Sequence, residues 1–242
     1  MMISKILCSD LRRDAMLKML SGPVRAADIG NERSATTNKI NAIKPLIDSG
    51  YIEKDGYDYR LTGPGRIIAL QVRQMADSMK VLQDDFFEQH DLSSIPDRLL
   101  MRIGALKGGG VIQPNGDAMK AQHNFMDHVT TSKKICGASC FNVDGYEDMI
   151  SFALANGAEI ELILSPEVLT TLDHKILESW QASGNFVLHV RKVKAAFTVA
   201  DDMLFLAMFD PAGIIDALSE WVCQSEEAAE WGRELFKYYL GD

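Results

Sequence analysis

The chain of 242 residues lacks several features that would assign it to a functional class at once. No apolar run is long enough to cross a membrane, and the first residues lack the pattern of a signal peptide. We therefore expect a cytoplasmic protein with no membrane partner. Phosphate-binding glycine loops, a nucleophile elbow and dinucleotide-binding glycines are also missing. The sequence accordingly predicts no enzyme, no catalytic residue and no cofactor.

Cysteine is scarce, with four residues in the chain. In a cytosolic protein, this number favours free thiols over a disulfide framework. Cys136 and Cys140 are four residues apart, and no second pair stands near enough to complete a zinc site, so no metal site is predicted. The pair has two other interpretations, which are small buried apolar side chains and a redox switch. The redox switch is retained as an alternative mechanism for a regulator.

Positive charge is also scarce, because the net charge of the whole chain is −9. Residues 1–64, however, hold ten basic and eight acidic side chains, a net charge of +2, which leaves −11 for the remainder. Any contact with a polyanion therefore belongs to the first quarter of the chain. The composition is that of an ordinary globular protein, and the length suits two modest domains.

The helix expected from Ser34 to about residue 49 carries the strongest functional signal. At about 100° per residue, its apolar residues point one way and its short polar residues point the other, with lysines on the flanks. Such side chains hydrogen-bond base edges and phosphates in a major groove. The predicted DNA-contacting residues of this helix are Ser34, Thr37, Asn38, Lys39, Asn41 and Lys44.

A β-hairpin is expected next, with two short runs around Asp55 and Gly56. Lys54 and Arg60 are its predicted phosphate contacts. Three helices, a hairpin and a further helix form the layout of a winged helix-turn-helix domain. The segment 43–65, with the runs SGYI at 49–52 and YRLT at 59–62, resembles the end of a bacterial or archaeal winged-helix regulator. A winged helix used only for protein contacts is the alternative.

A long helix is expected over residues 65–90, because apolar residues recur at steps of four and three. This spacing predicts a dimer seam. Its residues are Ile68, Val72, Met75, Met79, Leu82 and Phe86. The alternative is a long helix whose apolar stripe packs on the C-terminal domain of its own chain.

The remainder alternates between strands and helices. Strands are expected at 135–139, 159–164, 186–190, 195–199 and 203–209, and helices at 146–156, 166–181 and 225–240. This alternation predicts an α/β domain with a largely parallel sheet. A basic cluster follows the third strand and is a candidate site for an anionic effector, or else a solvated charged edge. Its residues are His189, Arg191, Lys192 and Lys194.

The segment 86–104 resembles a family of archaeal regulators that join an N-terminal winged helix to a Fil-type methanogenesis-regulator domain. Later runs carry the same resemblance: ICGAS at 135–139, GAEIEL at 157–162, FTVADD at 197–202 and AEWGRELF at 229–236. It covers essentially the whole chain and implies a transcriptional regulator of archaeal origin.

The sheet domain is also similar, more weakly, to half of a phospholipase D. Those enzymes place His-x-Lys-x4-Asp on a strand here, because His attacks phosphorus and Lys holds the phosphate. In this chain Lys194 stands in place of His, Ala196 replaces Lys, and only Asp201 remains. A degenerate phospholipase D-like enzyme is therefore only a remote alternative.

Together these patterns predict an α+β winged helix-turn-helix domain at 1–64, a connecting and dimerisation helix at 65–95, and an α/β effector-sensing domain with a phospholipase D-like sheet at 96–242. The predicted function is that of a homodimeric, sequence-specific regulator. Its expected partners are double-stranded DNA, a second copy of the chain, and an unidentified small-molecule or protein effector.

Overall fold

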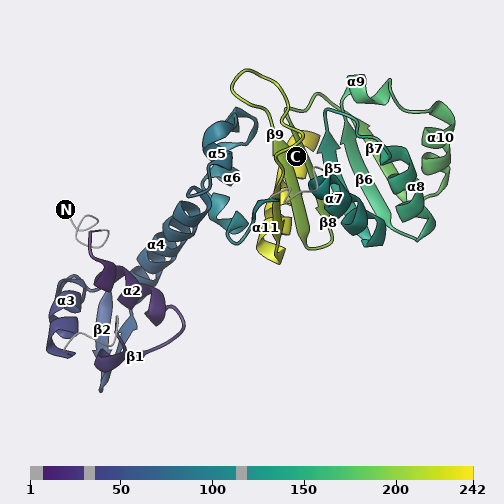
Figure 1. The fold of residues 1–242 in the computed structure, drawn as a ribbon. Helices are drawn as coiled ribbons and strands as arrows, with labels where there is room; N and C mark the ends of the chain where they lie inside the picture. The colour runs from purple at the N-terminus through teal and green to yellow at the C-terminus, as the bar shows by residue number, and fades with distance from the viewer. Residues whose placement is uncertain (1–7, 30–35, 113–118, 242) are drawn as a thin grey trace. The chain divides into compact units, whose positions relative to one another are not determined.

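A computed structural model describes residues 8–29, 36–112 and 119–241, and the chain in it mixes helices and strands. It divides into two compact units, residues 1–77 and 78–242, and the boundary lies within helix α4 (Gly63–Val81) (Figure 1). In the described residues, no helix is both long enough and apolar enough to cross a membrane.

The first unit packs two helices against a small antiparallel sheet (Figure 1). Its elements are α2 (Asp10–Met19), β1 (Val24–Arg25), the 3-10 helix η1 (Ala26–Asp28), α3 (Thr36–Asp48), β2 (Ile52–Asp55) and β3 (Asp58–Leu61). The strand order is β1-β3-β2. Met16, Ile43 and Leu46 are fully buried where the helices meet the sheet, so the apolar face of α3 is the face predicted from its periodicity.

Glycines fix the turns of this unit. Gly50 ends α3 and Gly56 closes the hairpin, and both have positive φ, of 73° and 63°. A Cβ on Gly65 would lie 1.8 Å from the Tyr51 carbonyl oxygen. Only glycine therefore lets α4 start against the hairpin.

The long helix predicted over 65–90 is wrong in its second half, because α4 ends at Val81 and α5 (Phe86–Gln89) is a separate helix. The Asp84 carboxylate accepts a hydrogen bond from the Phe86 amide at 2.9 Å, which turns the chain between them. The second of the three helices expected before the hairpin is only η1, since Val24 and Arg25 pair with β3 as a strand.

The second unit is built on a seven-stranded sheet in the order β4-β10-β9-β8-β5-β6-β7. The strands are β4 (Gly110–Val111), β5 (Lys134–Ser139), β6 (Glu159–Leu164), β7 (Phe186–Val190), β8 (Ala195–Ala200), β9 (Met203–Met208) and β10 (Trp221–Gln224). Only β5, β6 and β7 run parallel. The largely parallel sheet that we predicted is therefore wrong. Alternation along the chain reveals strands but not their directions, and β8, β9 and β10 return as antiparallel neighbours.

Two apolar cores lie on opposite faces of this sheet (Figure 1). Helices α7 (Lys120–Thr131), α8 (Tyr146–Ala155) and α10 (His174–Ala182) cover one face, and α11 (Glu226–Leu240) covers the other. The short helices α5, η2 (Leu92–Ser94), α6 (Asp97–Leu100) and η3 (Ile103–Leu106) contribute to the α11 core. Trp231 of α11 is fully buried, and its indole donates to the Leu99 carbonyl at 3.0 Å.

Helix 166–181, predicted as one element, is broken into α9 (Pro166–Leu169) and α10. The Thr170 and Thr171 hydroxyls donate to the Glu167 and Val168 carbonyls, and the Asp173 carboxylate caps the next helix at the Lys175 amide, 2.7 Å away. Such local bonds compete with a continuous helix, and the apolar periodicity does not register them.

Candidate functional site

The polar ridge of α3 is exposed as the sequence predicts. Thr37, Asn38, Asn41 and Lys44 are all exposed, and the helix is held from below by the buried Ile43 and Leu46. Ser34, predicted to begin this ridge, lies outside the described residues. Three short polar side chains and one lysine on a rigid helix give donors, acceptors and a cation that can enter a groove together.

Lys39 does not belong to this ridge. Its side chain is buried, with 3% exposure, and its ammonium donates to the Ala27 carbonyl at 2.6 Å. The lysine stem runs along apolar surface while its charged end satisfies the end of η1. The helical wheel places Lys39 on the flank but cannot show that η1 packs there. The predicted DNA contact is therefore wrong, and Lys39 has a structural role.

The hairpin of β2 and β3 presents Lys54 and Arg60, both exposed. Arg60 is already paired within the hairpin, since its guanidinium lies 2.8 Å from the Glu53 carboxylate and 3.3 Å from that of Asp55. Among the described residues no such pairing is found for Lys54. Lys54 is thus the better phosphate contact, and Arg60 offers a charge that is largely compensated.

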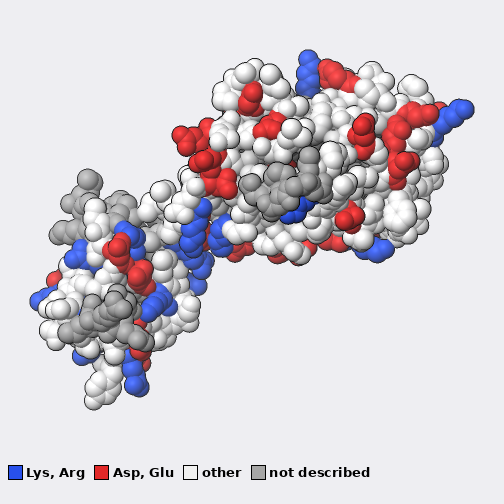
Figure 2. All heavy atoms as spheres, viewed as in Figure 1, with Lys and Arg blue, Asp and Glu red and all other residues white. Residues whose placement is uncertain are grey.

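The sequence predictions missed three candidate contacts of the first unit. Tyr57 stands at the tip of the hairpin with 91% of its surface exposed. Arg66 and Arg73 are exposed and seven residues apart on α4, a spacing that aligns them on one side of the helix. Figure 2 shows Lys and Arg side chains gathered over α4. The same spacing of seven that relates apolar residues of the predicted seam also relates Arg66 and Arg73 in the sequence.

The predicted dimer seam is divided by burial. Val72 is buried in the core of the first unit, with Ile68 packed at its edge, and Phe86 is buried in the second. Met75, Met79 and Leu82 are exposed, with Met79 58% exposed. Ile67 and Leu70 of α4 are exposed as well. The seam as predicted is therefore wrong at Ile68, Val72 and Phe86, because these side chains stabilise the two units themselves.

Cys136 and Cys140 are partly buried free thiols beside the α11 core. Burial raises the pKa of each thiol to about 11. Since the thiolate is the reactive form, both are poor redox centres at neutral pH. Their surroundings favour the apolar interpretation over the switch.

The predicted basic cluster is an exposed edge. Arg191, Lys192 and Lys194 are exposed on the connection from β7 to β8, and His189 on β7 lies 2.8 Å from the Glu161 carboxylate. None of the four lines either of the two cavities described in this unit. This arrangement favours a solvated edge over an effector site.

The residues that align with the phospholipase D motif do not meet. Lys194 precedes β8 and Asp201 follows it, so about 20 Å of strand separates them. The Asp201 carboxylate accepts hydrogen bonds from the Lys133 and Lys134 amides at 2.9–3.2 Å, which fixes the start of β5. The carboxylate of Asp201, which is what remains of the motif, thus has a structural role.

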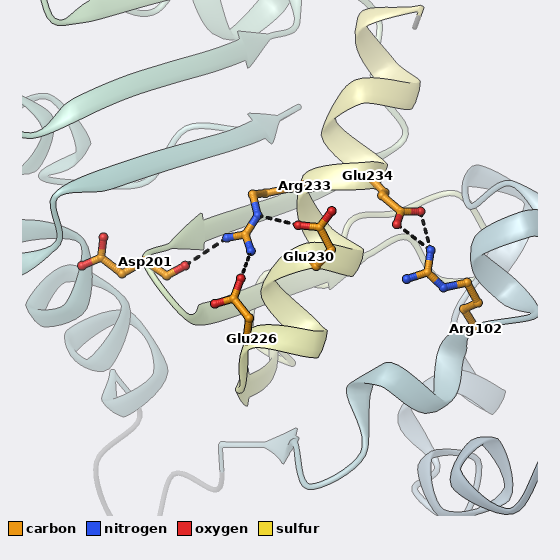
Figure 3. A network of polar contacts seen from close by, with 6 residues as sticks. All are labelled: Arg102, Asp201, Glu226, Glu230, Arg233 and Glu234. Carbon is orange, nitrogen blue, oxygen red and sulfur yellow. Dashed lines mark hydrogen bonds and ion pairs between the residues drawn. The ribbon is translucent and has the colours of Figure 1, made fainter. Parts of the chain in front are cut away.

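The Asp201 backbone also anchors α11, as Figure 3 shows. The Arg233 guanidinium donates to the Asp201 carbonyl at 3.3 Å and to the Glu230 carboxylate at 3.1 Å, and it pairs with Glu226. A separate pair, Arg102 with Glu234, ties the same helix to the segment before η3. These contacts hold α11 in place within the second unit.

Solved structures resemble the chain only loosely. The archaeal chromatin protein TrmBL2, whose structure is described as showing a novel mode of DNA binding, covers 95% of this chain at 14% identity, with 92% of its own length matched and a TM-score of 0.46. NucT from Helicobacter pylori covers 55% of this chain at 12% identity, with 95% of its own length matched and a TM-score of 0.42. Such scores carry no argument about function.

The sequence comparisons are more specific. The methanogenesis regulatory protein FilR1 of Methanothrix harundinacea (strain 6Ac) is 26% identical over 218 residues, which are 84% of this chain and 48% of that protein. The chain thus spans about half the length of this curated relative. The family described as methanogenesis regulatory protein FilR1, middle domain, matches residues 119–242, just over half of the chain. The chain therefore belongs to this family of Fil-type archaeal regulators.

Proposed function

We propose that the protein is a sequence-specific, DNA-binding transcriptional regulator that acts as a homodimer. The observation that carries this proposal is the exposed ridge of Thr37, Asn38 and Asn41 on α3, next to a β-hairpin. In this proposal, residues 1–64 are a winged helix-turn-helix domain, α4 connects it to the rest, and the sheet unit senses an effector.

The ridge has the chemistry for direct readout. An asparagine amide can donate to and accept from adenine at once, in the major groove, where each base pair presents a distinct pattern. Lys44 and Lys54 would contact phosphates on either side, and Tyr57 would lie where a hairpin meets the adjacent backbone or minor groove. The modest positive charge of this segment means that affinity must depend on salt and on specific base contacts.

Dimerisation is supported by apolar side chains that are exposed on α4 and just after it, which are Ile67, Leu70, Met75, Met79 and, beyond the end of the helix, Leu82. Apolar side chains gathered in this way are unfavourable in water and are covered when a second copy packs against them. The two DNA-binding domains of a dimer would bind two half-sites, which multiplies the specificity of each domain.

A genomic-fragment selection with the full chain, followed by sequencing of the bound duplexes, tests the proposal and identifies the site. On that site Asn41→Ala should weaken binding by about 1–3 kcal/mol, roughly 5–150-fold, with little change on unrelated duplexes. Gln181→Ala, which removes an exposed amide from α10, is the matched control and should bind normally. An enrichment of no sequence, or equal affinity of Asn41→Ala, would contradict the proposal.

A further inference from the structure

The sheet unit has a cavity of about 100 Å³ on the face covered by α7. Its walls come from α7, from the middle of β5 and β8, and from the segment that leads into β10. The lining residues used below are Phe125, Phe141, Tyr146, Thr198 and Glu220. Since a water needs about 10–15 Å³ by this measure, the space suits a molecule of roughly seven non-hydrogen atoms.

Small side chains create this space. Ala196 and Ala207 line it from the adjacent strands β8 and β9, where larger side chains would fill it. These positions thus leave room for a small ligand.

Glu220 is the only charged residue among the described residues that line the cavity. No hydrogen bond or ion pair to its carboxylate is found in the described part of the chain. Glu220 is half-buried, and this loss of hydration raises the pKa of its carboxyl group to about 8. An ionised carboxylate at this position lacks a counter-ion, and a bound cation would supply one.

The rest of the wall suits an organic cation better than a metal ion. Phe125, Phe141 and Tyr146 bring three aromatic rings to the cavity. Aromatic faces attract ammonium groups, and alkylated ammonium ions lose little hydration on entering such a pocket. In the described residues, no cluster of three or more carboxylate, histidine or cysteine ligands exists that could hold a metal.

We propose that this cavity binds a small alkylammonium ion, with the Glu220 carboxylate as its counter-ion and the aromatic rings around its alkyl groups. The larger groove beside α11, of about 880 Å³, does not select a charge in this way, because Lys134, Arg233 and Lys237 line it together with Glu159, Glu161 and Glu226. The further statement that the cation is the effector rests on the proposed DNA-binding function.

The cavity wall and α5, the first helix after α4, are linked through two consecutive residues. Glu220 and Trp221 are consecutive, so their side chains face opposite sides of the strand. Trp221 packs against Phe86 and Phe87 of α5, with ring centroids 5.8 Å and 4.9 Å apart. A second link follows α5. The His90 imidazole lies 3.5 Å from the Asp216 carboxylate, and the next residue, Ala217, lines the cavity. Occupancy of the cavity can therefore shift α5.

Thermal unfolding and calorimetry of the full chain test the site with choline as the probe. Choline at about one hundred times its Kd should raise Tm by about 5–10 °C. Dimethylbutanol, in which carbon replaces the cationic nitrogen, and dimethylbutyrate, its anionic counterpart, should produce no shift. Glu220→Gln should abolish the choline effect, and the exposed Glu178→Gln on α10 should retain it.

The pH dependence gives a second readout. Glu220 and Tyr146 are the only titratable groups among the described residues that line the cavity. Burial raises the pKa of the Tyr146 phenol, which stays neutral. Choline binding must release the Glu220 proton below pH 8, so affinity should rise about tenfold per pH unit up to about 8 and then level off. Equal binding of dimethylbutanol, or an unchanged choline affinity in Glu220→Gln, would overturn the proposal.

DNA-binding measurements distinguish failure of the cation site from failure of the proposed DNA-binding function. A changed DNA affinity in saturating choline, lost in Glu220→Gln, supports the cation as effector. Choline binding without any DNA binding would leave the site standing and overturn the regulator, whereas DNA binding without choline binding would overturn the site alone. Binding of both with no mutual effect would overturn the effector role.

Discussion

The α3 ridge and the Glu220 cavity differ in how their residues are brought together. The ridge comes from one helix, and each of Thr37 and Asn38 lies three or four positions from Asn41, so the backbone alone places them on one face. The cavity is assembled from α7, β5, β8 and the segment before β10, which are separated by up to a hundred residues. A local surface can be inferred from periodicity, whereas an assembled site cannot be recognised until the topology is known.

The exposed apolar side chains of α4 and of Leu82, which follows the helix, give the largest expected effect and test whether two α3 ridges act together in a dimer. Met79→Glu together with Leu82→Glu should convert a dimer to a monomer, since each exposed side chain buried in a dimer contributes about 1.5–3 kcal/mol. Sedimentation equilibrium measures the change. Val187→Glu, an exposed apolar position on β7, is the control and should leave the mass unchanged. A wild-type chain that sediments as a monomer at all concentrations would contradict the dimer.

Glu220 gives the next largest effect and concerns the cavity alone. Its pKa is about 8 in the folded chain and near 4.5 when unfolded, so the folded state binds more protons between these values and stability falls as pH rises. Glu220→Gln removes this loss and should be more stable than wild type at pH 9 by about 2–4 kcal/mol, with little difference at pH 4.5. Denaturant unfolding at both pH values measures it. An equal difference at the two values would contradict the assigned pKa.

The two lysines of α3 are expected to differ in role, since Lys39 is buried and Lys44 is exposed on the ridge. Lys39→Met should lower the free energy of unfolding by about 1–3 kcal/mol, because the Ala27 carbonyl loses its buried donor. Lys44→Met should leave stability unchanged but weaken binding to all duplexes and reduce the salt slope by about 1. Chemical denaturation and DNA titration at several salt concentrations distinguish them. Reversed effects would mean that the two side chains were assigned the wrong way round.

Much of the fold could be predicted from the sequence where structure is local. The face of α3, the Asp55–Gly56 hairpin and the cap of α11 follow from period, turn chemistry and the Ser225 hydroxyl, which accepts from the Ala228 amide. The positions of β5 to β9 were also predictable, whereas the short strands β4 and β10 were not predicted. Strand directions could not be predicted either, because alternation along the chain does not show that β8, β9 and β10 are antiparallel neighbours.

The errors share one physical cause. Lys39 on the flank of α3 and Phe86 in the apolar series each have a sequence position that fits the predicted role. In the fold, however, each side chain contacts a group distant in the chain, which is the Ala27 carbonyl for Lys39 and the Trp221 ring for Phe86. Sequence pattern gives the direction of a side chain, and tertiary packing decides whether solvent or protein lies there.

Hydroxyl-radical footprinting of the full chain on its selected site tests most directly whether paired α3 helices read DNA. A dimer that places one α3 in each of two major grooves should protect two segments about 10–10.5 base pairs apart, or a multiple of that spacing. Asn38→Ala with Asn41→Ala should remove both protections while the chain remains dimeric. A single protected segment, or protection that survives in the double variant, would contradict it.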